Sequence, residues 1–257
     1  MIYNGDAIEI LRTLDPESFD AVVTDPPYGE RNASWDGPRD AAWWTAWLIE
    51  AKRVLKADAP LVTFCSRRYL DIAMGAVRAV FGDSSNRPLQ SGAWVHRQGY
   101  APREGLLRPE HEPYIVSGFL RVQADKVRRT RAYKTPHNVA RKETRRLSST
   151  IGFGAYTYKP NAAGPVAGTI IENARNIPSE RLEHPTQKPE AVMDYLVKLA
   201  CPLGGTVLDP FLGSGTTAVV AVRSGRYFVG IDANPDYVAM ATRRVAGIAP
   251  LFTEDNA

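Results

Sequence analysis

The stretch that decides the fold is Val207–Thr217, VLDPFLGSGTT. An apolar strand ends at Asp209, a loop containing Gly213 and Gly215 follows, and a helical pattern begins at Thr216. Glycine lets the backbone approach a ligand closely, and the free N–H groups at a helix N-terminus attract an anion. The stretch therefore predicts a strand–loop–helix unit that binds a carboxylate or a phosphate.

The loop departs from two common nucleotide-binding motifs. Gly215 is followed by Thr216 where a Walker A loop has lysine, and the glycine spacing is not that of the dinucleotide fingerprint. The next apolar run ends at Asp232, where an acid can hold the hydroxyl pair of a ribose. Together these features predict a nucleoside cofactor that carries a carboxylate, and they disfavour nucleotide hydrolysis and nicotinamide chemistry.

Strands and helices alternate on both sides of this unit. Short apolar runs predict buried strands at 20–24, 60–65, 205–209 and 226–232, and residues 91–98 and 112–119 predict an antiparallel pair. Helical patterns lie at 6–14, 40–55, 189–200, 216–224 and 235–245. We expect Trp43, Trp44 and Trp47 to pack the second of these helices against the core. The alternation predicts an α/β fold with a doubly wound, mostly parallel sheet.

Composition narrows the class of protein. The chain has 257 residues of ordinary apolar content and charge, enough to bury one full core. It shows no signal peptide at its start and no apolar run of membrane-spanning length, so we expect a cytoplasmic protein without a membrane partner. Its two cysteines, Cys65 and Cys201, are isolated, which predicts neither a disulfide framework nor a metal site.

Charge is unevenly distributed along the chain. Residues 118–150 hold ten Lys or Arg and only two acids, a net charge of +8 against +4 for the whole chain. A basic segment within a mildly acidic body favours a polyanionic partner, although a solvated loop has the same composition. Periodicity fades between residues 120 and 169, which is typical of an insertion that is functional or disordered.

A second strand, within Ala21–Gly29 (AVVTDPPYG), ends in an acid that two prolines and an aromatic ring follow. Alone, such residues also form ordinary turns after strands. Two more segments accompany it, His184–Pro189 (HPTQKP) and Gly230-Ile231-Asp232, and Asn4-Gly5-Asp6, Trp35-Asp36 and His111-Glu112 recur in similar places. With the glycine loop, these motifs resemble the β group of S-adenosylmethionine-dependent DNA amino-methyltransferases, in which the catalytic motif precedes the cofactor loop.

The resemblance implies a Rossmann-like methyltransferase fold in permuted order, with a seven-stranded sheet. Residues 1–117 would form its catalytic half, 118–170 a small target-recognition insert, and 171–257 its cofactor-binding half. The implied catalytic residues are Asp25, Pro26, Pro27 and Tyr28. The implied cofactor-binding residues are Asp6, Ala7, Asp25, His184, Thr186, Gln187, Lys188, Asp209, Phe211, Gly213, Ser214, Gly215, Thr216, Thr217, Asp232 and Asn234.

Within that set the resemblance assigns Asp6 and Ala7 to the adenine of the cofactor and Asp232 to its ribose. The segment from His184 to Lys188 would close the carboxylate end of the cofactor, S-adenosylmethionine.

The implied chemistry explains the residues around Asp25. Methyl transfer from a sulfonium to an exocyclic amine is an in-line displacement, and the obstacle is an amine lone pair delocalised into the base. The Asp25 carboxylate and a backbone carbonyl after it would accept the two N–H groups of that amine. Pro26 and Pro27 fix φ and remove competing donors, and Tyr28 offers a face to a base that has left the duplex.

The resemblance also implies the substrate. In this family an Asp at the first position of the motif goes mostly with adenine N6 and a Ser mostly with cytosine N4, so adenine in double-stranded DNA is expected, with cytosine N4 as the alternative. Contacts to DNA are expected from Arg67, Arg68, His96, Arg97, Arg128, Arg129, Arg131, Lys134, Arg141, Lys142, Arg145 and Arg146.

Other interpretations stay open at this point. One is a DNA-binding protein that keeps the cofactor but performs no chemistry, against which the intact Asp25, Tyr28 and glycine loop argue. The amine chemistry also suits RNA or protein substrates. The resemblance leaves a homodimer and a cognate restriction endonuclease undecided.

Overall fold

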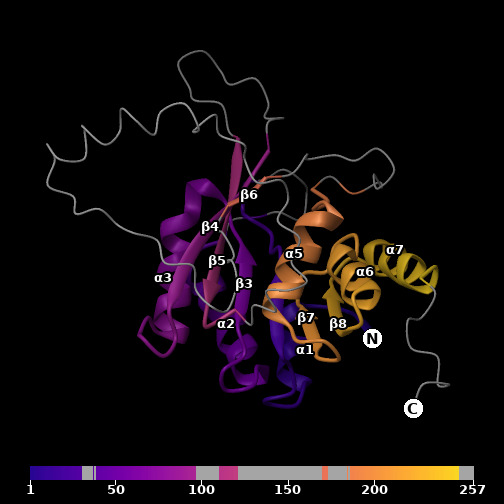
Figure 1. The fold of residues 1–257 in the computed structure, drawn as a ribbon, viewed down its shortest axis with the longest axis horizontal. Coiled ribbons are helices and arrows are strands. Elements are labelled where there is room, and N and C mark those ends of the chain that lie inside the picture. The colour runs from indigo at the N-terminus through magenta and orange to yellow at the C-terminus, as the bar shows by residue number, and fades with distance from the viewer. Residues whose placement is uncertain are drawn as a thin grey trace, which may run out of the picture.

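One sheet of eight strands forms the centre of the molecule, in the order β1-β8-β7-β2-β3-β5-β4-β6 (Figure 1). The computed structural model describes residues 1–30, 37, 39–96, 110–120, 170–172, 184 and 186–248. The strands are β1 (Ile2–Asn4), β2 (Ala21–Thr24), β3 (Leu61–Phe64), β4 (Leu89–Val95), β5 (His111–Ser117), β6 (Ile170–Glu172), β7 (Thr206–Asp209) and β8 (Tyr227–Asp232). Among these strands, β5 alone runs antiparallel to both of its neighbours, β3 and β4.

Helices cover both faces of the sheet (Figure 1). One face packs against α1 (Ala7–Thr13), α2 (Ala41–Val54) and α3 (Leu70–Phe81), the last preceded by the 3-10 turn η1 (Arg67–Tyr69). The other face packs against α5 (Glu190–Ala200) and α6 (Thr216–Arg223), and α7 (Pro235–Ala246) lies beside α6. The predicted doubly wound, mostly parallel α/β fold is therefore confirmed.

The strand β2 shows why its sequence is apolar at every position. Val22 points into the cluster formed with α2, where Trp47 and Leu48 are fully buried. Ala21 and Val23 point the other way, into the cluster formed with α5. Since a strand covered on both faces has no solvent side, its residues need no polar alternation.

The tryptophans of α2 behave as expected. Asp40 caps the helix, its carboxylate accepting the backbone N–H of Trp43 at 2.8 Å. Trp44 and Trp47 are buried in the core. Trp43 is only partly buried, and its ring lies 5.5 Å from that of Phe211, at the edge of the pocket described below.

The predicted elements recur within a few residues of their expected bounds, and four further elements were not predicted: β1, β6, η1 and α3. The sheet consequently has eight strands, not seven. Strands from residues 1–117 and from 171–257 lie in this one sheet, whereas nearly all of 118–170 lies outside the described residues. Among the described helices, none combines the length and the apolar character needed to cross a membrane.

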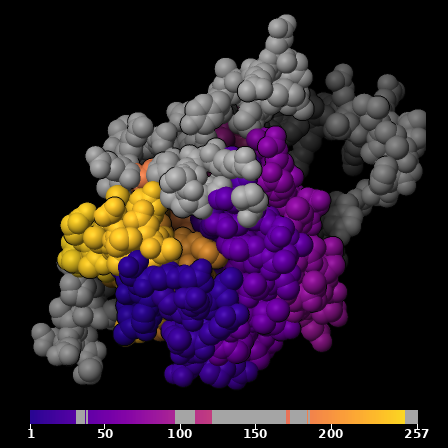
Figure 2. All heavy atoms as spheres, turned by 180° about the vertical axis from the view of Figure 1, so that it is seen from behind, coloured from indigo at the N-terminus to yellow at the C-terminus, as the bar shows by residue number. Residues whose placement is uncertain are grey.

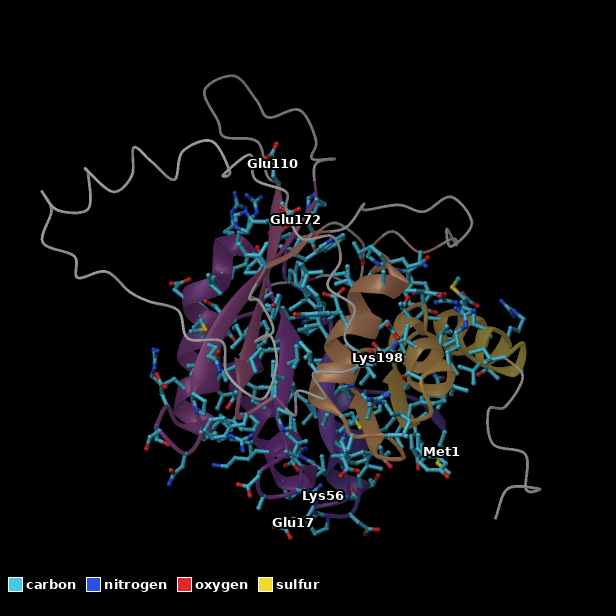
Figure 3. The ribbon with its side chains drawn as sticks, viewed as in Figure 1. Met1, Glu17, Lys56, Glu110, Glu172 and Lys198 are labelled. Atoms are coloured by element: carbon cyan, nitrogen blue, oxygen red, sulfur yellow. The ribbon has the colours of Figure 1, made fainter. Side chains whose placement is uncertain are left out.

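The two ends of the sheet differ in what they carry. Figure 3 shows Glu110 and Glu172 at the end where the parallel strands finish, and Glu17 and Lys56 at the opposite end. Asp209 and Asp232 are the last residues of β7 and β8, and Asp25 directly follows β2. Ligands bind at this carboxyl edge in open α/β sheets.

We predict that Gly215→Ala destabilises the fold more than Gly204→Ala does. Both glycines have positive φ, +81° and +72°, a strain that costs an alanine about 1–2 kcal/mol. A Cβ at Gly204 meets nothing within 4 Å, whereas at Gly215 it would lie 2.6 Å from the Cβ of Ala241 on α7. Overpacking adds about 1–3 kcal/mol. Urea denaturation of the two variants measures this difference, and equal losses would contradict it.

Candidate active site

A pocket of about 500 Å³ opens where β2, β7 and β8 end. Its volume lies within the range of small-molecule sites. Figure 2 shows this side of the molecule recessed between the indigo N-terminal segment and the yellow C-terminal helix α7. Apart from Gly215, every predicted catalytic and cofactor residue lines it: Asp6, Ala7, Asp25, Pro26, Pro27, Tyr28, His184, Thr186, Gln187, Lys188, Asp209, Phe211, Gly213, Ser214, Thr216, Thr217, Asp232 and Asn234.

Asp209 joins the glycine loop to β2. Its Oδ1 accepts the hydroxyl of Thr24 at 2.5 Å and the backbone N–H of Phe211 at 3.1 Å. Burial raises the pKa of Asp209 to about 6, and hydrogen bonds from Thr217 and Thr24 oppose that rise. The acid therefore shapes the turn that follows β7.

Asp232 fixes the other side of the loop. One carboxylate oxygen accepts the backbone N–H of Gly213 at 2.7 Å, and the other accepts that of Asn234 at 2.8 Å. Burial raises the pKa of Asp232, while these two hydrogen bonds oppose the rise. The side chain of Asn4 donates to the carbonyl of Asp232 at 3.0 Å, which brings the N-terminal segment to the same edge.

His184 covers the glycine loop. A Cβ at Gly213, where φ is +51°, would lie 3.0 Å from Nε2 of His184, so only glycine leaves this approach open. The imidazole stacks at a tilt on Tyr237, with ring centroids 4.5 Å apart. Burial, with Lys188 and Arg244 nearby, lowers the pKa of His184 to about 4, so the ring is neutral at pH 7.

Two predicted cofactor residues have another role in the structure. Gly215 faces α7 and does not line the pocket, so its glycine serves close packing of α6 against α7. Asp6 lines the pocket, but its Oδ1 caps α1 by accepting the backbone N–H groups of Ile8 and Glu9.

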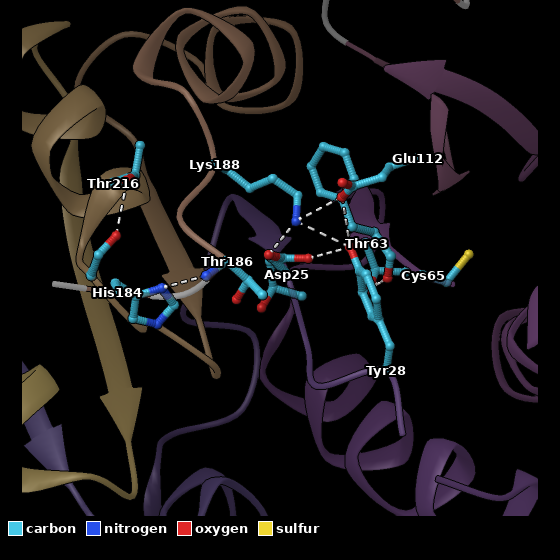
Figure 4. Close-up of polar contacts among 12 residues, drawn as sticks. Asp25, Tyr28, Thr63, Cys65, Glu112, His184, Thr186, Lys188 and Thr216 are labelled. Atoms are coloured by element: carbon cyan, nitrogen blue, oxygen red, sulfur yellow. Dashed lines mark hydrogen bonds and ion pairs between the residues drawn. The ribbon is translucent and has the colours of Figure 1, made fainter. Parts of the chain in front are cut away.

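Asp25 lies in a polar cluster built from four side chains (Figure 4). Its Oδ1 accepts the hydroxyl of Tyr28 at 2.6 Å, and its Oδ2 lies 2.5 Å from Nζ of Lys188. The same ammonium donates to the Tyr28 oxygen at 3.1 Å and lies 3.1 Å from Oε2 of Glu112. It also lies over the rings of Tyr28 and Phe64, 5.3 and 5.0 Å from their centroids.

The cluster shifts the pKa of each member. Burial raises the pKa of Asp25, Lys188 opposes that rise, and the charge of Glu112 adds to it. Burial disfavours the ammonium of Lys188, but the two carboxylates outweigh it and raise its pKa. Burial together with Asp25 and Glu112 raises the pKa of Tyr28 well above its ordinary value. Tyr28 is thus a neutral donor and Lys188 a cation.

Two features of this cluster were not predicted. Lys188, expected at the carboxylate end of the cofactor, points instead to Asp25 and Glu112. Glu112 belongs to the His111-Glu112 pair, to which the family resemblance assigns no role. The position of Glu112 in the sequence could have predicted a charged partner, because an acid near the start of a buried apolar strand is costly unless it is paired.

The expected DNA contacts separate into three groups. Arg67 and Arg68 are exposed in η1, directly after β3, at the same edge as the pocket. His96 is only 2% exposed, with Nε2 3.6 Å from Oε1 of Glu112, so its position does not support a direct contact with DNA. The others lie outside the described residues: Arg97, Arg128, Arg129, Arg131, Lys134, Arg141, Lys142, Arg145 and Arg146.

Comparison with known proteins identifies the family. The family model described as DNA methylase (N6_N4_Mtase) matches residues 19–243. The chain belongs to this DNA methylase family. Type II methyltransferase M.ScaI of Streptomyces caespitosus is 26% identical over 257 residues, 95% of the chain and 81% of the relative. DNA adenine methyltransferase YhdJ of Escherichia coli (strain K12) is 27% identical over 253 residues, 95% and 82% of the two chains.

Solved structures share the methylase fold. The M1.HpyAVI–SAM complex aligns with a TM-score of 0.59 at 20% identity, covering 95% of this chain and 98% of the other. The cytosine-N4-specific PvuII DNA methyltransferase aligns with a TM-score of 0.65 at 15% identity, covering 98% and 88%. Since the similar proteins include adenine and cytosine-N4 enzymes, membership of the methylase family does not decide the base.

We predict that Asp209→Asn flattens the pH dependence of stability. The pKa of Asp209 is higher in the folded than in the unfolded state, so folding favours the protonated acid and stability falls as pH rises from about 4 through about 6. A shift of this size corresponds to roughly 3 kcal/mol. Asparagine keeps the acceptor oxygen for Thr24 and Phe211 without the charge.

The measurement is urea denaturation at a series of pH values, comparing the wild type with Asp209→Asn. Asp15→Asn, which changes an exposed acid in the loop before β2, is the control. A variant that follows the wild-type pH dependence would contradict the assignment.

Proposed function

We propose that this protein transfers a methyl group from S-adenosylmethionine to the N6 amine of adenine in specific sites of double-stranded DNA. The observation that carries the proposal is the position of Asp25, whose carboxylate lies in the same pocket as the glycine loop and Asp232. An acceptor for the target amine and a site for the methyl donor thus face one space.

The pocket suits a nucleoside that carries an amino acid. Asp232, oriented through two backbone N–H groups, would hold the ribose hydroxyls. The backbone of Gly213, kept open by the lack of a side chain, would line the methionine part beneath His184. Ala7 and Trp43 offer apolar surface for the adenine ring, and the α1 cap by Asp6 fixes that wall.

The chain's own residues would act on the amine. When bound, the cofactor would supply a methyl group activated on a sulfonium, and the methyl–sulfur bond would break as the methyl is transferred, with the sulfur leaving as a neutral thioether. The Asp25 carboxylate accepts one N–H of the amine and stabilises the positive charge that grows on nitrogen as the N–C bond forms. A backbone carbonyl of the Pro26-Pro27 segment accepts the other N–H, and the surplus proton leaves through Asp25.

Tyr28 would position the base. Its ring borders the pocket, and its hydroxyl is fixed to Asp25 at 2.6 Å. Because the raised pKa keeps this hydroxyl protonated, Tyr28 donates to Asp25 without adding charge. The face of the ring remains for stacking on a base that has left the duplex.

We favour adenine over cytosine as the substrate because Asp25 stands at the first position of the catalytic motif, where the resembled family has mostly Asp in adenine enzymes and mostly Ser in cytosine-N4 enzymes. The similarity to the adenine methyltransferase YhdJ supports this choice. The fold shared with the cytosine-N4-specific PvuII enzyme makes cytosine N4 the second candidate. Both bases present an exocyclic amine, so the same acceptors serve either substrate.

We predict that Asp25→Ala abolishes DNA methylation while cofactor binding is retained. The substitution removes the acceptor but leaves Asp232 and the glycine loop intact, and Lys188 keeps Glu112 as its partner. Expression in a methylation-free host followed by single-molecule sequencing reads the base, the site and the activity, and calorimetry measures cofactor binding. Asp15→Ala is the control.

Methyl transfer retained in Asp25→Ala would refute the assignment of Asp25. Modified cytosines in place of modified adenines would select the second candidate.

The basic segment is the proposed DNA-reading element. Residues 118–150 carry a net charge of +8, and phosphates are the groups that such a segment attracts. Arg67 and Arg68, exposed at the pocket edge, would add phosphate contacts from the body of the protein. A few polar side chains would read the base edges.

We predict that reversing the charges of Arg128, Arg129 and Arg131 weakens DNA binding and flattens its salt dependence. The plot of log affinity against log salt has a negative slope, and each lost phosphate contact reduces the magnitude of that slope by about 1. Fluorescence anisotropy at several salt concentrations measures both, with calorimetry to confirm that cofactor binding is spared. Lys56→Glu, at the opposite end of the sheet in Figure 3, is the control. An unchanged salt slope in the triple variant would refute the contact.

A further inference from the structure

The ammonium of Lys188 occupies an unusual place. Its side chain is only 6% exposed, and lysine is rarely so buried unless it is paired. It donates to Asp25 at 2.5 Å and lies over the ring of Tyr28. These are the contacts that the proposed function asks of the target amine: an N–H donated to Asp25, beside the ring of Tyr28. Lys188 therefore stands where that amine must bind.

A second acceptor lies within reach of the same nitrogen. Oε2 of Glu112 is 3.1 Å from Nζ of Lys188, and this carboxylate comes from β5, on the far side of the cluster from Asp25 (Figure 4). Lys188 can consequently release Asp25 without losing its counter-ion. That matters because an ammonium left buried and unpaired is costly.

We propose that Lys188 is a positioning residue that holds the Asp25 carboxylate until the base arrives, and that Glu112 then keeps Lys188 while the target amine binds Asp25. The inference rests on the proposed function, because it assumes that an amine is the substrate. No covalent bond is made or broken in this step. The Lys188 ammonium, which pairs with both Asp25 and Glu112, becomes paired with Glu112 alone.

The groups that face Asp25 come from every neighbouring element. They are Tyr28 from its own loop, Lys188 before α5, Glu112 on β5, Cys65 after β3 and Asp209 on β7. Of these, Lys188 lowers the pKa of Asp25 by its charge and Glu112 raises it. Burial raises the pKa of Cys65 to about 12, so that thiol is neutral at pH 7. Removing either charged partner therefore moves the titration of Asp25 in a defined direction.

The test compares two isosteric variants, Lys188→Met and Glu112→Gln. In Lys188→Met the acid limb of kcat/KM moves to higher pH, because Asp25 loses the charge that favours its ionised form. In Glu112→Gln the limb moves to lower pH, and KM for DNA rises by about tenfold or more, the effect of one charged hydrogen bond that now stays on Asp25. The acid limb of kcat/KM reports the free enzyme.

Controls come from an ion pair of the same type outside the site. Lys198 and Asp194 pair at 2.7 Å on the surface of α5, so Lys198→Met and Asp194→Asn change the same charges without facing the pocket. Both should leave the pH profile and KM at wild-type values. Carboxyl-carbon NMR, with Asp25 assigned through Asp25→Asn, follows the same titration without requiring turnover.

The outcomes separate the two proposals. Opposite shifts of the Asp25 titration in the two variants, with the rise in KM confined to Glu112→Gln, support the inference. Wild-type profiles in both variants, shifts in the same direction, or a wild-type KM for DNA in Glu112→Gln overturn it. Should Lys188→Met not fold, the KM of Glu112→Gln decides, since a Glu112 that acts on Asp25 through its charge alone shifts the titration to lower pH but leaves KM unchanged. A wild-type protein that methylates no DNA refutes the proposed function, whatever the NMR titration shows.

Discussion

The parallel pairing of β2 with β7 is the contact on which the pocket depends. Ala21 and Val22 pair with Val207 and Leu208, and the hydroxyl of Thr24 closes the pair on Asp209 across a separation of 185 residues. Because parallel neighbours finish at the same edge, the loop after β2 and the loop after β7 must face each other. The position of the two loops in the fold does not depend on which loop comes first in the chain. A permuted sequence can therefore form the same site.

The same edge collects three buried or partly buried acids, and the protein stabilises them in two different ways. Asp232 accepts backbone N–H groups at both oxygens, and Asp209 accepts a backbone N–H and the hydroxyl of a strand residue. Such partners are fixed by the fold, so these two acids keep one orientation, which shapes the turn after β7 and sets the position of Asp232 in the pocket. Asp25 is held by the ends of two long side chains, Tyr28 and Lys188. Only partners of this second kind can withdraw to admit a substrate, as the role proposed for Asp25 requires.

Local patterns in the sequence predicted the parts of the fold that local chemistry determines. Apolar runs ending in acids marked β2, β7 and β8, and the glycines marked the loop after β7. Two of the elements that escaped prediction, β1 and β6, have three residues each, too few for a period. The helix α3 is different, because its twelve residues bury Ala73, Ala76 and Val77 at helical spacing, a local pattern that could have predicted it. The pairing of Asp25 with Lys188 spans 163 residues, and that of Tyr28 with Glu112 spans 84. No local rule predicts which distant side chain meets an acid, so the family motif suggested a cofactor role for Lys188 that its geometry does not show.

Glu112 reaches the site because β5 runs against its neighbours. In a parallel strand, the residues at the carboxyl edge of the sheet are those that follow the strand, as Asp25 follows β2. In an antiparallel strand, the residues at that edge are those at the start of the strand. Glu112 is the second residue of β5 and pairs in register with Trp94, near the end of β4. The partners of a reactive carboxylate in a doubly wound sheet should accordingly be sought after the parallel strands and at the start of any antiparallel one. Here that rule leads to Glu112 as a second carboxylate near Asp25, and Lys188, which lies between the two, can pair with either.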